Sequence, residues 1–177
     1  MAPAVFNPFE DRLSRDIRND LSESIAGVLY DRSLAGAEAV AQSYLKASPA
    51  PPYVDYINSR LDRYARALEQ IGTDTPLLHQ AAVLWDLQLF FEVHEILEPA
   101  WIRASGSRRL ILQALIRAAG VYINLELGYR QRAAKIGAKA LPVLETFKTE
   151  IGAEIDIDKL ISAIRILAPA APLIARA

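Results

Sequence analysis

Apolar residues recur every three or four positions along nearly the whole chain, and no run of β-branched residues alternates over the length of a strand. This spacing is typical of amphipathic α-helices, because their period is about 3.6 residues per turn. One stripe extends over residues 9–30, a second ends at the Pro-rich breaker at 48–52, and a third continues to Gly72. Short connections between such segments favour antiparallel neighbours. The sequence therefore predicts an all-α fold, a bundle of about seven or eight helices built from antiparallel helical hairpins.

The length of 177 residues and the hydrophobic content of 52% fit a single globular domain. Within a domain spanning 1–177, we expect a helical extension over 1–72, a motif-bearing core bundle over 73–148, and a C-terminal helix and tail over 149–177. Local signals mark some boundaries. Thr75 and Pro76 read as the start of a helix, Asp86 as the cap of the helix after it, and Gly106 as part of a turn. Asp156 or Asp158 starts the last helix.

Composition excludes several classes of function. The net charge of −1 argues against a nucleic-acid partner, which needs a clear basic excess. The chain has no cysteine, which excludes disulfides, zinc fingers and thiol nucleophiles. The first ten residues lack the basic start and apolar run of a secretory signal. We expect no membrane segment, because the most apolar stretch is interrupted by Gln113, Arg117, Asn124 and Glu126. A cytoplasmic location is the resulting expectation.

The most informative segment is a histidine among carboxylates in the helix expected over 87–104. On a helical wheel, His94 shares one face with Phe90, Leu97 and Trp101. Glu98 lies one turn after His94, Glu95 sits further round, and Glu92 is expected on the opposite, solvated side. A histidine within an apolar stripe is costly to bury unless it has a polar partner.

The next helix offers that partner. It carries a polar stripe along an otherwise apolar surface, formed by Gln113, Arg117, Gly120 and Asn124. Antiparallel docking would place Gln113 and Arg117 within reach of Glu98 and His94. The missing side chain of Gly120 would permit close approach of a helix or a ligand.

The pattern His-Glu-x-x-Glu-x-x-Trp, followed by Gln-x-Leu-Ile on the next helix, resembles the uncharacterised bacterial and archaeal family catalogued as domain of unknown function 309. The resemblance covers roughly Leu77 to Leu144 and implies an all-helical bundle without implying an activity. The residues that carry it are His94, Glu95, Glu98, Trp101, Gln113, Leu115 and Ile116. The chain departs from the family pattern at Pro99, Tyr129 and Arg132.

Three functions remain open for this group of residues. The leading hypothesis is a binding module for a small ligand or a peptide. Its expected ligand-binding residues are His94, Glu95, Glu98, Trp101, Gln113, Arg117 and Asn124. The second is an acid–base enzyme, a hydrolase or lyase, with His94 and Glu98 as catalytic candidates. The third is a buried polar network that only fixes helix register, in an interaction protein.

We expect no metal and no cofactor. His94 and Glu98 have metal-ligand spacing, but a third protein ligand is not evident. The expected partner is an unidentified small molecule or protein, and a homo-oligomer is possible in addition.

Overall fold

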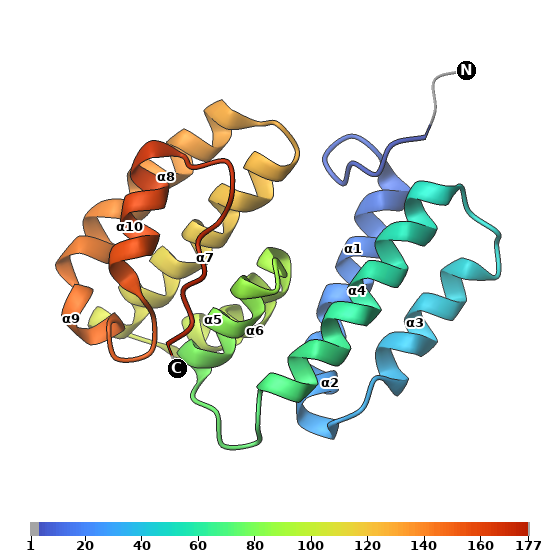
Figure 1. Ribbon diagram of the computed structural model, residues 1–177, viewed down its shortest axis with the longest axis horizontal. Coiled ribbons are helices and arrows are strands. Elements are labelled where there is room, and N and C mark those ends of the chain that lie inside the picture. The colour runs from blue at the N-terminus through green and yellow to red at the C-terminus, as the bar shows by residue number, and fades with distance from the viewer. Residues whose placement is uncertain (1–3, 177) are drawn as a thin grey trace. The chain divides into compact units, whose positions relative to one another are not determined.

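The computed structural model describes residues 4–176, so the first three residues of the segment considered for a secretory signal lie outside the described part. Within that part the fold is all-α, as predicted (Figure 1). The only β pairing among residues 4–176 is an isolated bridge between Ile155 and Ala175. No helix in this range has the length and apolar character needed to cross a bilayer.

The chain divides into two compact units, one ending at Thr73 and the other beginning at Asp74. The first unit contains four helices, α1 (Arg12–Glu23), α2 (Ile25–Asp31), α3 (Ala35–Leu45) and α4 (Pro51–Gln70). The second contains α5 (Leu77–Asp86), α6 (Phe90–Arg103), α7 (Gly106–Glu126), α8 (Arg130–Thr146), α9 (Lys148–Ile151) and α10 (Ile157–Ile166).

The core of the first unit forms where the predicted apolar stripes meet. Ile17 and Leu21 of α1 pack with Ala41 of α3 and Ile57 of α4, and all four are fully buried. The helix expected over 9–30 is divided at Ser24, whose hydroxyl donates to the carbonyl of Leu21 at 2.6 Å. Such local bonds from a serine side chain compete with helical continuity, so α1 ends at this position.

The second unit is built on the hairpins α6–α7 and α7–α8, whose helices pack along each other. Leu97 of α6 and Leu112 of α7 are fully buried between them. An aromatic group lies at the other end of the hairpin, where the ring centroids of Trp85 and Tyr122 are 5.1 Å apart and those of Phe90 and Tyr122 are 5.4 Å apart. Edge-on and offset ring packing of this kind stabilises a core beyond its buried area.

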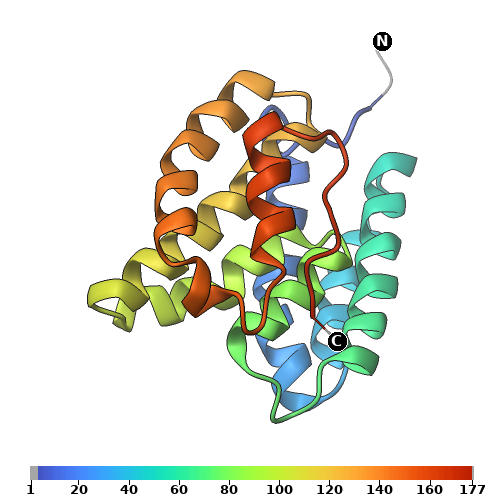
Figure 2. The ribbon, with the colours of Figure 1, turned by 60° about the vertical axis from the view of Figure 1, so that its left-hand side comes forward.

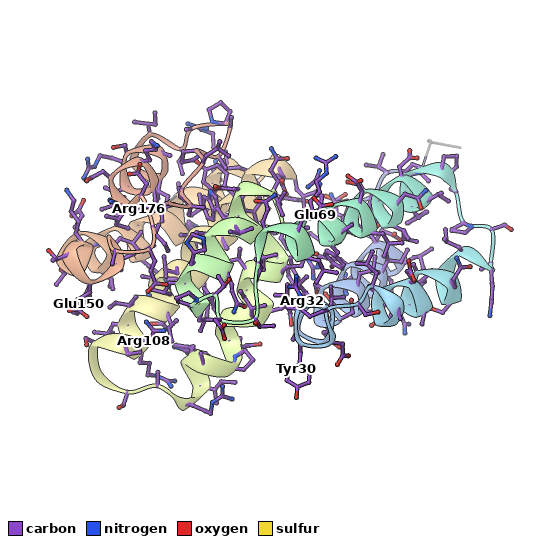
Figure 3. All side chains as sticks on the ribbon, turned by 60° about the horizontal axis from the view of Figure 1, so that its bottom comes forward. Tyr30, Arg32, Glu69, Arg108, Glu150 and Arg176 are labelled. Atoms are coloured by element: carbon purple, nitrogen blue, oxygen red, sulfur yellow. The ribbon has the colours of Figure 1, made fainter. Side chains whose placement is uncertain are left out.

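The C-terminal segment after α10 runs back across the second unit and ends beside α5 (Figures 1 and 2). The Asp86 carboxylate accepts the backbone N–H of Ile174 at 2.7 Å and that of Ala175 at 3.1 Å. The Trp85 indole N–H donates to the carbonyl of Pro172 at 2.9 Å. Arg176, labelled in Figure 3, donates to the carbonyl of Ile155 at 3.2 Å. Residues 172–176 are therefore packed against the second unit as part of its fold.

These contacts correct the role expected of Asp86. The sequence suggested that it caps the helix after α5, but α6 begins at Phe90 and its N-cap position is Leu89, which makes no side-chain cap. Burial raises the pKa of Asp86 above its usual value of 3.8, and the two backbone N–H bonds from the tail partly oppose that rise. At the start of the last helix the expectation holds, because Asp156 accepts from the backbone N–H of Lys159 and caps α10.

Candidate functional site

The polar residues predicted to meet on α6 and α7 do meet. His94, Glu98 and Trp101 from α6 and Gln113, Ile116 and Arg117 from α7 line one pocket of about 290 Å³, here called the His94 pocket. The two helices are joined by only two residues and run back along each other, so side chains one turn apart on each form opposite walls. The i, i+4 spacing on both helices was the signal that located this site.

His94 lies at the edge of the buried face of α6. Its side chain is 30% exposed, whereas Leu97 on the neighbouring position of the wheel is fully buried. His94 Nδ1 is 3.3 Å from Glu95 Oε1, and Nε2 is 3.9 Å from Glu98 Oε1. The first distance allows a hydrogen bond that orients the ring, and the second is too long for one. The Nε2 side of the ring is therefore separated from Glu98 by more than hydrogen-bond distance.

Glu95 lies beside the His94 pocket and is not one of the residues that line it. Glu98 is 42% exposed and does line it, with its carboxylate open to solvent. Glu92, expected to be solvated, is fully buried. That expectation was wrong because the wheel gives relative directions around α6 but does not reveal which of those directions the rest of the chain covers.

The α7 wall consists of two half-buried polar side chains, Gln113 and Arg117, separated by the half-buried Ile116. Among residues 4–176, neither Gln113 nor Arg117 makes a side-chain hydrogen bond or an ion pair. A guanidinium carries five N–H donors and no acceptor, so its usual partners in proteins are carboxylates, carbonyls or bound anions. The N–H donors of Arg117 therefore face the pocket and solvent.

One end of the pocket is fixed by Arg109, which the sequence reading did not single out. Its guanidinium lies 4.5 Å over the ring of Trp101 and donates to the Trp101 carbonyl at 2.9 Å. The same group reaches the carbonyls of Ile102 and Ala104, so it caps the C-terminal end of α6. In the sequence, the position of a basic residue just after the turn at Gly106 could have predicted that Arg109 bonds to the carbonyls at the end of α6.

Asn124 is not brought to the pocket. Its amide donates to the carbonyl of Gly120 at 2.8 Å, one turn earlier on α7, and its side chain is buried. Gly120 itself makes no close approach, because a Cβ placed there would have its nearest neighbour, an Ile136 methyl, at 3.7 Å. The close approach of helices occurs instead at Gly137, where a Cβ would lie 3.0 Å from Ile164 Cγ2.

No group of three or more His, Asp or Glu side chains suited to a metal ion occurs within the described residues.

Comparison with known proteins gives one match. The family model described as Domain of unknown function (DUF309) covers residues 78–136, from α5 into α8. The matched segment is about a third of the chain. The match confirms the resemblance inferred from the sequence, and it includes every residue of the His94 pocket. No curated protein and no solved structure gives a significant match to the chain.

Proposed function

We propose that the domain of unknown function 309 in this chain is a binding module for a small polar molecule, held in the His94 pocket. One observation carries the proposal: Gln113 and Arg117 are half-buried on the pocket wall without a protein partner among residues 4–176. Partial burial weakens the hydration of polar groups, and that loss is not compensated by any bond within the described chain. A ligand that accepts their hydrogen bonds would restore the balance.

The arrangement supports binding over a structural network. A network that fixes the register of α6 and α7 needs direct hydrogen bonds between the helices, in a site closed to water. On the α7 side, neither Gln113 nor Arg117 makes such a bond among residues 4–176. The exposed fractions of 30% for His94 and 42% for Glu98 also leave the pocket accessible to a ligand.

The size of the pocket favours a small molecule over a peptide. Its volume of about 290 Å³ is at the lower end of the range typical of ligand pockets. Trp101 and Ile116 add apolar surface between the polar groups, which is the usual composition of such sites.

The test is a screen of small polar compounds that measures the rise in thermal unfolding temperature. A ligand present at a hundred times its Kd stabilises the folded state by about 2.7 kcal/mol. We expect hits whose effect is lost in His94→Leu and Arg117→Met. The matched control is Arg108→Met, because Arg108 is an exposed arginine on the same helix that does not line the pocket (Figure 3). Hits that stabilise all variants equally would place binding elsewhere and contradict the proposal.

A second candidate function rests on the orientation of His94. The contact of Nδ1 with Glu95 at 3.3 Å would fix the ring, and Glu98, 3.9 Å from Nε2, could exchange a proton with it through a water or a substrate atom. This is the geometry of an acid–base pair in a hydrolase or lyase. Conversion of a bound compound by the wild type, abolished in His94→Gln while binding persists, would support this enzyme. Equal conversion by both would refute it.

A further inference from the structure

We propose, resting on the binding function above, that the ligand is a small zwitterion: a carboxylate with a neighbouring ammonium group, as in an α-amino acid. The proposal follows from the unequal chemistry of the two walls of the His94 pocket.

The α7 wall presents donors. Arg117 and Gln113 lie one turn apart on the same face of α7, and both line the pocket. Within the described residues no carboxylate pairs with the Arg117 guanidinium. The planar fork of a guanidinium matches the two oxygens of a carboxylate, and the amide of Gln113 can donate to one of them. This wall is therefore suited to a carboxylate.

The α6 wall presents acceptors. Glu98 lines the pocket with an accessible carboxylate whose nearest basic group is His94, at 3.9 Å. Glu95 adds a second negative charge behind the His94 ring, at 3.3 Å from Nδ1. An ammonium group on the ligand would be attracted to this wall. A phosphate or another multiply charged anion would instead be repelled by the two carboxylates.

The apolar side chains give the ligand its third contact. Trp101 is held in place by Arg109 stacked over its ring, and Ile116 lies between the two polar residues of the α7 wall. A compact aliphatic or aromatic side chain fits against these surfaces. With about 290 Å³ available, a molecule of the size of a single amino acid fills the pocket.

The experiment compares matched compounds by isothermal titration calorimetry on the full chain. One trio is leucine, leucinamide and 4-methylpentanoate, and the other is phenylalanine, phenylalaninamide and 3-phenylpropanoate. In each trio the second compound, the amide, lacks the carboxylate, and the third compound lacks the ammonium group. We expect the amino acid of at least one trio to bind best, about tenfold or more tighter than its two analogues, because each analogue loses a bond to a charged group.

Variants assign the contacts. Arg117→Gln should reduce the preference for the amino acid over its amide to near unity, and Glu98→Gln should do the same for the preference over the deaminated acid. Arg108→Gln should leave both preferences unchanged. The unfolding temperatures of all three should stay close to that of the wild type, since Arg117 has no described partner to lose.

Failure of this inference is distinguishable from failure of the binding function. If the amides bind as tightly as the amino acids, the assignment of a carboxylate to the α7 wall is overturned, while the pocket still binds small molecules. If no member of either trio binds, the zwitterion proposal is overturned as well. The binding function then fails only when the wider screen of polar compounds is also negative.

Discussion

Replacing the polar residues of the His94 pocket by leucine should barely change stability, whereas truncating the core residue between them should destabilise the fold severely. Leu97 is fully buried at the α6–α7 interface. Leucine-to-alanine changes at such positions cost about 2–5 kcal/mol, because they remove buried methyl groups and leave a cavity. His94 and Glu98 are 30% and 42% exposed, and the ion pairs of His94 with Glu98 and with Glu95 are partly exposed to solvent. Exposed pairs of this kind contribute about 0–1 kcal/mol.

We therefore expect His94→Leu and Glu98→Leu to change the free energy of unfolding by no more than about 1 kcal/mol, in either direction. Leu97→Ala should lose about 3 kcal/mol, which shifts a urea midpoint by about 1–3 M. Tryptophan fluorescence is a suitable probe because both tryptophans, Trp85 and Trp101, lie in the second unit. The signal therefore reports on the unit that contains the substitutions.

Far-UV circular dichroism provides a second signal, which includes the helices of the first unit. Losses in both leucine variants that match the loss in Leu97→Ala would refute the reasoning. They would mean that His94 and Glu98 stabilise the helices as a structural network.

Three further outcomes are expected. Gly120→Ala should raise the free energy of unfolding by about 0.5–1 kcal/mol through helix propensity, whereas Gly137→Ala should give no gain, because its new Cβ would lie 3.0 Å from Ile164 Cγ2. Chemical denaturation of the two variants checks this difference. Asp86→Asn should cost about 1–3 kcal/mol, since an amide keeps one acceptor oxygen for the two N–H groups of the tail, and should speed hydrogen exchange at Ile174. Burial raises the pKa of Asp86 above 3.8, so the stability that comes from its protonation is complete below the unfolded pKa and is lost as pH rises through the raised folded value. The wild-type advantage over Asp86→Asn should therefore grow as pH falls toward 3.8. Elemental analysis of protein prepared without chelator should find no stoichiometric zinc or iron, and about one ion per chain would favour metal-assisted chemistry instead.

The sequence was sufficient to predict the helices and the group of polar residues that α6 and α7 bring together in the His94 pocket. Both depend on periodicity: residues at i and i+4 share a face whatever the rest of the chain does. Because the turn between α6 and α7 is short, the two helices are neighbours, and the polar residues on both made the meeting of the faces that carry His94 and Gln113 the favoured arrangement. The sequence alone therefore groups the pocket residues.

Properties that depend on distant parts of the chain could not be predicted in this way. Glu92 is fully buried, and a helical wheel carries no information about which side of α6 the rest of the chain covers. Asp86 accepts backbone bonds from residues 88 and 89 positions later, a partner that no local pattern indicates. Asn124 shares the polar stripe of α7 but bonds to its own backbone, because a short amide side chain readily does so.

The course of the C-terminal segment has a practical consequence for the expression of the matched region on its own. The matched residues end at 136, within α8, yet a small apolar cavity of the second unit is lined jointly by Trp85 and Leu115 from the matched part and by Ile155, Leu160 and Ile174 from beyond it. A fragment cut at the limits of the match would leave those surfaces facing water. Such a fragment should aggregate on expression, whereas one that continues through residue 176 keeps its apolar surface covered.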